Sequence, residues 1–484
     1  MNKNSRIPGR LSAVLAATVL AGCANFSGIE PQSTLRTAQD VGIPQAAGTP
    51  APEQVVAPQW WKDFGDAQLD RLVDQALQGS PNLRIAQARL ARAQAVQELA
   101  HSATQPQVQG SLEATRQRFS ANNIYPPPLG GSTRDLGTLR LGGSWELDFF
   151  GKNRQALEAA LGASRAAQAD VDAARVLLAG NVARSYFQVA RLQDQLQVAQ
   201  RTLGQREESL KLVRDRVNAG LDTTLEERQS QAAIPETRQQ IEALQEQVQL
   251  TRNALAALVG QSDLQVEPRS LAQARPLAVP ATVPADLLGR RADIAAARWR
   301  VEAATHDIAS AKANFYPNVN LTAFVGLSSI GFNQLLKAGS EEWGVGPAIH
   351  LPIFDAGRLR ANLRGRTADL DLAVESYNGA LLDAVRDVAD QLASSQSIGR
   401  QQAQQREAQS AAESAYEIAT QRYKAGLGTY LNVLTAETAV LNQRRLAVDL
   451  AGRALDTQVQ LARALGGGFQ ADPATLRLAS QNTR

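Results

Sequence analysis

The chain has very few of the residues that build catalytic and metal sites. Its 484 residues include one cysteine, Cys23, and three isolated histidines, His101, His306 and His350. A single cysteine excludes an internal disulfide and a multi-cysteine metal site, and no histidine has a partner at a spacing such as HExxH. The glycines at 466–468 lack the Lys and Ser or Thr that follow in a phosphate loop. The sequence therefore predicts no enzyme activity, no metal and no cofactor.

Net charge and long apolar runs are also scarce. The formal net charge is +3, and Lys3, Arg6 and Arg10 all lie at the start of the chain. The remainder is close to neutral, which does not favour nucleic-acid binding. The apolar run 11–20 is too short to span a bilayer, and no run of about 18 apolar residues follows it. A part that crosses a membrane would have to be a closed barrel of strands.

The N-terminal stretch has the pattern of a secretory leader. Its apolar run ends at Leu20-Ala21-Gly22-Cys23, which resembles the cleavage box of bacterial lipoproteins. We expect residues 1–22 to be a signal peptide, Cys23 to carry lipid, and residues 23–65 to form a lipid-anchored linker. Each methylene of an acyl chain that is buried in the membrane contributes about 0.8 kcal/mol to the free energy of membrane binding. The alternative is a chance cysteine in a discarded leader.

Two pairs of alternating segments predict β-hairpins, at 107–149 and 318–354. Apolar and polar side chains alternate there with a period of two, as in a strand. Phe324 stands on the polar face, and Pro347 removes a backbone donor, so we expect a local distortion at Pro347. An apolar outer face and a polar inner face fit a membrane β-barrel, whereas the alternative is a soluble β-sandwich.

A very long helical pattern follows each predicted β-hairpin. We expect long helical hairpins at 152–259 and 358–465. Apolar positions in the first recur at steps of four and three from Leu157 to Leu203, the spacing of a left-handed supercoil. The polar members of this seam, such as Gln168 and Arg175, indicate imperfect packing.

A ten-residue segment that predicts a turn occurs twice in the chain with nearly the same sequence. Residues 216–225 read RVNAGLDTTL and residues 422–431 read RYKAGLGTYL, 206 positions apart (422 − 216). An unchanged offset across the helical unit indicates a duplication. We expect a first repeat at 66–260, a linker at 261–284, a second repeat at 285–466 and a tail at 467–484, each repeat reading strand, strand, long helix, helix.

The repeated turn has two interpretations. Its glycines can take the left-handed conformation that ends a helix, and its threonines can cap the next one. It is therefore either an ordinary helical hairpin or a tip that binds another protein. The apolar residue at each apex favours the tip, whose predicted residues are Arg216, Gly220, Leu221, Thr223, Arg422, Gly426, Leu427 and Thr429.

Four strands cannot close a membrane barrel, because the smallest such barrels have eight. Several chains must therefore contribute to any barrel of this kind. Three copies would supply a 12-stranded β-barrel continued by a 12-helix α-barrel. The predicted fold class is mainly α with a membrane β-barrel.

Several segments together carry a family resemblance. WWKDFGDAQLD, NFYPNVNLTAFVG, LPIFDAGRLRA and RYKAGLGTYLNVLTAE are similar to segments of the TolC/OprM-type outer-membrane efflux proteins, in particular the lipoproteins that serve multidrug pumps. The resemblance implies a homotrimer in the outer membrane that extends into the periplasm. It also implies docking to a periplasmic adaptor and coupling to an inner-membrane transporter, which we expect to be proton-driven.

The implied function is a passive exit duct for drugs or other small toxic compounds, opened at its periplasmic tip by the partners. A type I protein-secretion duct and a periplasmic coiled-coil scaffold without a pore are the alternatives. An adaptor or scaffold has no need of the apolar outward band that the alternating strands predict.

The resemblance also implies a periplasmic constriction. Many relatives carry an aspartate where this chain has Thr435, and some carry an acidic residue at the position of Asn432. Leu431 remains as a candidate apolar ring. Glu226 in the first repeat is either a source of charge at the constriction or a capping partner of Thr223.

Overall fold

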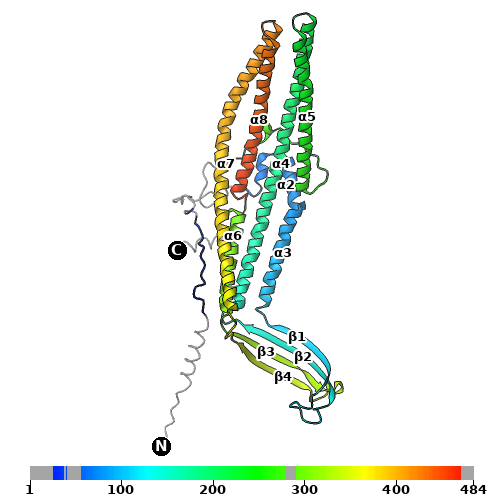
Figure 1. Ribbon diagram of the computed structural model, residues 1–484, viewed down its shortest axis with the longest axis vertical. Coiled ribbons are helices and arrows are strands. Elements are labelled where there is room, and N and C mark those ends of the chain that lie inside the picture. The colour runs from blue at the N-terminus through cyan, green and yellow to red at the C-terminus, as the bar shows by residue number, and fades with distance from the viewer. Residues whose placement is uncertain (1–24, 38–39, 41–55, 278–289, 470–484) are drawn as a thin grey trace. The chain divides into compact units, whose positions relative to one another are not determined.

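The computed structural model of the chain describes residues 25–37, 40, 56–277 and 290–469. The expected signal peptide, Cys23 and residues 470–484 of the expected tail lie outside the described residues. In chain order the elements are η2 (Trp60–Phe64), α2 (Ala67–Gly79), α3 (Pro81–Ser102), β1 (Gln107–Arg118), β2 (Thr133–Leu147), α4 (Lys152–Asn218), α5 (Thr224–Val259), η3 (Leu271–Gln273), α6 (Ala292–Ala313), β3 (Asn318–Ile330), η5 (Phe332–Gln334), β4 (Glu341–His350), α7 (Arg358–Lys424) and α8 (Tyr430–Ala464) (Figure 1).

The order of the elements confirms two repeats of strand, strand, long helix and shorter helix. The described chain divides in space into two compact units that cut across these repeats. One contains residues 25–35, 89–167 and 297–377, and the other contains the described parts of 36–88, 168–296 and 378–469. Each unit therefore draws on both copies, and α4 and α7 contribute residues to both units.

The first unit holds a four-stranded antiparallel sheet in the order β1-β2-β3-β4. The two predicted hairpins are joined because β2 pairs with β3, for example at Leu141 and Val325. The distortion expected at Pro347 is wrong, because β3 and β4 pair from Asn318–His350 to Leu327–Glu341 with no inserted residue. Within one chain β4 is an edge strand, and such a strand can leave a missing donor on its free side.

The sheet has one apolar and one polar face, since paired residues of neighbouring strands point to the same side. The exposed apolar residues of one face are Val108, Leu112, Leu139, Leu141, Trp145, Leu321, Val325, Trp343, Val345 and Ile349. On the other face, Arg140 bonds Glu342 at 2.7 Å and lies 4.3 Å from the centre of the Phe324 ring. Phe324 thus belongs to the polar face as a platform for Arg140, and a Cβ at Gly344 would lie 2.7 Å from its ring.

The start of the described chain packs along α7 in the first unit. Ile29 joins a buried cluster with Phe315 and Leu363, and Asp371 accepts hydrogen bonds from the backbone amides of residues 32 and 33 at 2.9 Å. Arg360 donates to the carbonyls of residues 25 and 27. Residues 25–33 of the expected linker are therefore fixed to α7.

The second unit begins with a well-capped helix. The Asp66 side chain accepts hydrogen bonds from the amides of Gln68 and Leu69 and so forms the N-cap of α2. Its second carboxylate oxygen accepts a 2.6 Å hydrogen bond from the hydroxyl of Tyr186 on α4. Tyr186 is 1% exposed, so a single aspartate both starts α2 and ties it to the long helix.

The predicted seam of α4 is only partly buried. Val182, Val189 and Leu192 are buried, whereas Gln168 and Arg175 are exposed. The large buried side chains of this stretch also include aromatic residues outside the seam, such as Phe187, which contacts Phe64 at 4.8 Å between ring centres. Packing against η2 and α2, rather than a two-stranded supercoil alone, decides which face of α4 is buried.

Candidate functional site

The two repeated turns, α4 to α5 and α7 to α8, have the same backbone. Gly220 has φ +74° and Gly426 has φ +75°. The amides of Gly220 and Leu221 donate to the carbonyls of Val217 and Arg216, and the same two bonds recur at an offset of 206 in the second turn. This is the Schellman arrangement, in which a left-handed glycine closes a helix. Both turns lie at the same end of the helical hairpins (Figure 1).

Leucines project into solvent at both turns. The exposed fractions are 65% for Leu221 and 69% for Leu427, and Leu225 and Leu431 one turn further on are each 60% exposed. Exposed apolar groups gathered at one place on a surface are typical of a protein-binding site. The sequence predicts the two apex leucines and Leu431, whereas Leu225 was missed although it is the repeat counterpart of Leu431 (431 − 225 = 206).

Arg216 points inward, so its predicted place at a docking surface needs correction. Its guanidinium forms a two-pronged contact with Asp222, with Nε–Oδ2 at 2.8 Å and Nη2–Oδ1 at 3.4 Å. It also lies 4.6 Å from the ring centre of Tyr423, whose hydroxyl donates to the same carboxylate. The side chains of Arg216 and Asp222 are each 12% exposed. The three residues, which we call the tip tie, join the first hairpin to the second.

The tip tie holds a charged aspartate. Burial opposes the charge of Asp222, but hydrogen bonds from Arg216 and Tyr423 outweigh burial and lower the pKa of this carboxyl below its ordinary value. Burial, together with the hydrogen bond to Asp222, raises the pKa of the Tyr423 phenol. The neutral phenol and the carboxylate thus form a stable donor and acceptor pair at neutral pH.

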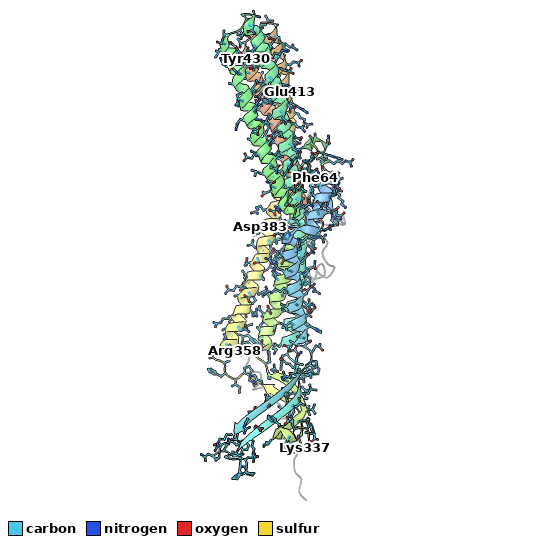
Figure 2. All side chains as sticks on the ribbon, turned by 90° about the vertical axis from the view of Figure 1, so that its right-hand side faces the viewer. Phe64, Lys337, Arg358, Asp383, Glu413 and Tyr430 are labelled. Carbon is cyan, nitrogen blue, oxygen red and sulfur yellow. The ribbon has the colours of Figure 1, made fainter. Side chains whose placement is uncertain are left out.

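A small apolar core lies directly behind the turns. Tyr423 and Tyr430 are 1% and 4% exposed, and they pack with Val213 and Val433. Figure 2 shows Tyr430 near the turn end of the hairpins. Neither tyrosine is among the tip residues that the sequence predicts. A sequence signal was available, because Tyr423 lies in the last turn of α7 and Tyr430 in the first turn of α8, on either side of the glycine turn.

Among the described residues, the second turn has no counterpart of the ion pair between Arg216 and Asp222. Arg422, the repeat counterpart of Arg216, is exposed and donates to the carbonyl of Leu427 at 3.3 Å. Gly428 stands where the first turn has Asp222, because 428 − 222 is again 206. Arg422 therefore presents its charge at the surface beside Leu427, as the sequence predicts.

The N-caps of α5 and α8 also differ, because the first has side-chain hydrogen bonds and the second does not show them within the described residues. Thr223 and Glu226 form a reciprocal capping box, with Thr223 N–Glu226 Oε2 at 3.0 Å and Leu225 N–Thr223 Oγ1 at 3.2 Å. The hydrogen bond from the Thr223 side chain lowers the pKa of Glu226, so the capping interpretation of this residue has direct geometric support. For Thr429 no side-chain cap bond is found within the described residues.

The candidate constriction residues are divided between two helices. Leu431 and Thr435 lie one turn apart on the exposed side of α8, and the Thr435 hydroxyl donates to the carbonyl of Leu431 at 2.9 Å. Glu226 lies at the start of α5, engaged with its cap. The structure therefore brings the first two together and leaves Glu226 with the other hairpin.

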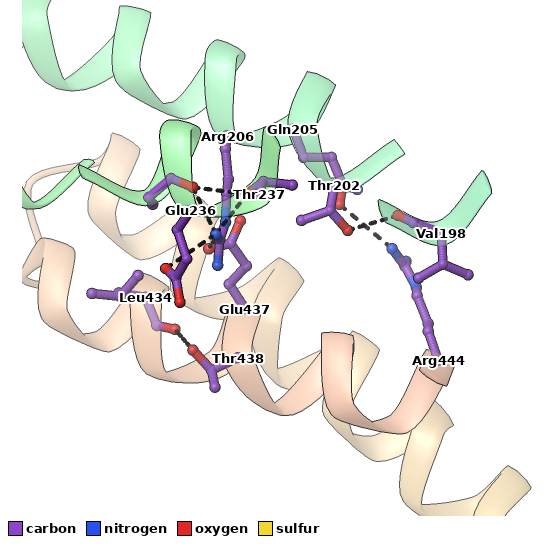
Figure 3. A network of polar contacts seen from close by, with 11 residues as sticks. Val198, Thr202, Gln205, Arg206, Glu236, Thr237, Leu434, Glu437, Thr438 and Arg444 are labelled. Atoms are coloured by element: carbon purple, nitrogen blue, oxygen red, sulfur yellow. Dashed lines mark hydrogen bonds and ion pairs between the residues drawn. The ribbon is translucent and has the colours of Figure 1, made fainter. Parts of the chain in front are cut away.

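A buried ion pair behind the turns was not predicted. Arg206 of α4 donates to the Ala233 carbonyl (2.9 Å) and the Thr237 hydroxyl (2.8 Å) on α5, and its Nε lies 3.4 Å from Glu437 of α8 (Figure 3). Glu437 is 6% exposed. In the sequence, Arg206 stands among charged residues that indicate a solvated face, so no local signal marks it.

The described ranges also bear on membrane spans and metal sites. None of the helices there is both long enough and apolar enough to cross a membrane. No group of three or more His, Cys, Asp or Glu side chains is placed to hold a metal ion in the same ranges.

Comparison with known proteins decides the family. The model of the outer membrane efflux protein family matches residues 72–261 and 283–467. This chain is an outer membrane efflux protein. The family matches the two stretches that contain the two repeats, which agrees with the duplication seen in the turns.

Named relatives of this efflux protein include resistance proteins. It is 33% identical to the multidrug resistance outer membrane protein MdtP of Escherichia coli over 96% of this chain and 97% of that protein. It is 39% identical to the fusaric acid resistance protein FusA of Burkholderia cepacia over 74% of this chain and 69% of that protein.

Solved channels share the fold of this efflux protein. The outer membrane protein VceC of Vibrio cholerae matches with a TM-score of 0.79 and 36% identity, over 86% of this chain and all of that one. The outer-membrane channel OprN matches with a TM-score of 0.82 and 29% identity, over 93% of this chain and all of that one. The mainly helical fold with its strand part is thus that of outer-membrane efflux channels.

Proposed function

We propose that three copies of the chain form a passive exit duct in the outer membrane. Each copy supplies four strands to a closed 12-stranded barrel, whose outer surface is the exposed apolar face of the sheet. The long helices continue the duct into the periplasm. The support comes from the apolar band on one face of the sheet and from the two unpaired edge strands within one chain, β1 and β4.

We further propose that Cys23 carries lipid after removal of residues 1–22, and that residues 23–65 lead from this anchor to the first repeat. Residues 66–260 and 285–466 are then the repeats, separated by the linker 261–284 and followed by the tail 467–484. The packing of the described N-terminal segment along α7 supports a chain that is fixed close to its anchor.

The exported compounds are drugs or other small toxic molecules, in line with the names of the relatives MdtP and FusA. The turns dock a periplasmic adaptor, which couples the duct to a proton-driven inner-membrane transporter. The observation that carries this proposal is the set of exposed leucines at both turns, beside the exposed Arg422. An apolar knob with a flanking charge fits a partner with a small apolar pocket and an acidic rim.

The constriction is apolar in this proposal. Leu431 and Thr435 face solvent on α8 and would form the narrow ring of the closed duct, whereas Glu226 on α5 serves as the capping partner of Thr223. Such a ring selects by size and wetting more than by charge.

The proposal is tested with Leu221→Gln and Leu427→Gln in one chain, in cells that depend on this duct for drug resistance. We expect at least a tenfold rise in drug susceptibility and loss of adaptor crosslinking. The amount of protein in the outer membrane and the ion conductance of the purified protein in planar bilayers should stay unchanged.

Leu250→Gln is the matched control, because Leu250 is 59% exposed on α5 but lies away from the turn. This control should keep normal efflux. Normal efflux by the double variant would contradict the docking role of the turns, and absence of conductance in the parent would contradict the duct itself.

A further inference from the structure

The buried ion pair behind the turns connects three helices. Arg206 extends from α4, bonds α5 through Ala233 and Thr237, and meets Glu437 of α8 (Figure 3). The first hairpin and the return helix of the second hairpin are therefore joined through one guanidinium. A movement of α8 away from the first hairpin must break the contact between Arg206 and Glu437.

The carboxylate of this pair is incompletely satisfied. Glu437 Oε2 faces Arg206 Nε at 3.4 Å, and Glu437 Oε1 has no hydrogen-bond partner among the described residues. A buried carboxylate without hydrogen bonds favours its protonated form. Burial accordingly raises the pKa of Glu437, and the attraction of Arg206 offsets only part of this effect.

Arg206, one member of the pair, borders a cleft. A cleft of about 430 Å³ lies between α4, α5 and α8, and its lining includes Arg206, Thr237, Thr438 and Arg445. Polar side chains and this volume suit water. Arg206 lines this cleft and contacts Glu437 at 3.4 Å, so we infer a short path for a proton from the cleft to the pair.

The second repeat has no counterpart of the pair at the equivalent positions. The repeat counterpart of Arg206 is Ala412, and that of Glu437 is Gln231, each at the offset of 206. A coiled-coil core needs neither charge at these places. The chain therefore has this pair at one of the two symmetry-related positions, where it joins the first hairpin specifically to α8.

We propose that Arg206 and Glu437 form a proton-linked latch, in which α8 packed against the first hairpin holds a proton on Glu437 more tightly than α8 moved away. Departure of α8 exposes the carboxylate to water and releases the proton. Acid then favours the packed hairpins and alkali favours their separation. The inference rests on the proposed function in one respect, because there the turns are the part that opens.

The charged surroundings agree with this direction. On α5, Glu236 lies 3.8 Å from Arg206, and its side chain is 77% exposed. On α7 and α8, Tyr416 and Tyr430 face Glu437, and burial raises the pKa of both phenols, so they stay neutral. Arg206 is the cation beside Glu437 among the described residues, and its attraction does not reverse the effect of burial.

A carboxyl whose pKa is higher in the packed state than in the separated state adds stability to the packed state at low pH. This added stability is lost as the pH rises through the pKa of the packed state.

The test measures the distance between α5 and α8 in the full-length protein in detergent. Gln239→Cys and Ala439→Cys, both at exposed positions, receive spin labels in a Cys23→Ser background, and labelled chains are diluted with unlabelled protein. Between pH 5.5 and pH 8.0 we expect at least a twofold rise in the population at longer distance. In Glu437→Gln, whose neutral side chain resembles the protonated acid, the distribution should not change with pH.

Two further variants make the result specific. Glu413→Gln removes another glutamate of the same hairpin, which pairs with Arg444 at 3.0 Å and has a 40% exposed side chain. It should keep the parent's response. Arg206→Met should keep a pH response but move its midpoint to higher pH, because the carboxylate has lost its cation. This variant also provides the test if Glu437→Gln does not fold.

The latch is overturned if the parent shows no change between the two pH values. It is equally overturned if Glu437→Gln responds as the parent does. The distances are measured on purified protein without an adaptor, so a failure of docking at the turns does not affect them.

Discussion

The two turns share a backbone but not their side-chain contacts. Gly220 and Gly426 have the same conformation, and the closing hydrogen bonds recur one for one. The first turn adds the tip tie and a full capping box, whereas the second has Gly428 in place of Asp222 and an exposed Arg422. After duplication, the backbone was kept by its glycine and the side chains diverged. One turn became fixed to its neighbour, and the other kept its charge for the surface.

The two turns differ most at Tyr423, which is buried and bonded to Asp222, and at its repeat counterpart Val217, which is half-buried. We expect Tyr423→Ala to cost about 3–5 kcal/mol, because it removes a fully buried ring and the donor to Asp222. Val217→Ala, at a half-buried position, should cost about 1 kcal/mol or less. Hydrogen exchange of the last turns of α4 and α7 measures both. Equal acceleration in the two variants would contradict the inequality of the turns.

Much of this architecture follows from local sequence signals. The glycine and threonine pattern predicts both turns, and the period-two segments predict both strand pairs, because these features depend on neighbours in the chain. The tip tie joins Asp222 to Tyr423, and the latch joins Arg206 to Glu437. These two contacts cannot be predicted from the sequence, because each joins residues of different repeats. An arginine on a charged helix is predicted to be solvated unless the position of the partner helix is known.

In the sheet, too, contacts within a repeat are predictable and contacts between repeats are not. Each hairpin is predictable, but the pairing of β2 with β3 is not, because it joins strands of different repeats. Phe324 had no explanation in the alternation until Arg140 and Gly344 were placed beside it. The expected distortion at Pro347 failed because the rule for proline in strands depends on whether the strand has neighbours on both sides.

Asp222→Asn removes the negative charge of the tip tie and keeps the size of the side chain. Asp222→Asn should cost about 2 kcal/mol, because it weakens the hydrogen bonds of Arg216 and Tyr423 to a charged partner. Since the pKa of Asp222 is lowered in the folded state, the stabilisation is present above the ordinary value of about 3.9 and is lost as the pH falls further.

Thermal unfolding of the purified protein between pH 3 and pH 7 measures this effect, with amide exchange near residue 222 as the local readout. The variant should lose the part of the acid dependence that comes from the tie. A variant that melts with the parent's full pH dependence would show that Asp222 does not carry the charge of the tie.

The smallest difference between the turns concerns their caps. Thr223→Ala removes the hydroxyl that accepts from the Leu225 amide and donates to Glu226, but the backbone amide of residue 223 can still donate to Glu226. We therefore expect a cost of about 1 kcal/mol and faster amide exchange in the first turn of α5. Thr429→Ala should cost less than about 0.5 kcal/mol, because its hydroxyl makes no cap bond within the described residues. Thr429→Ser is the matched control for loss of the methyl group alone. If Thr429→Ala were as costly as Thr223→Ala, the second turn would be capped in solution, and the two turns would differ only through Asp222 and Tyr423.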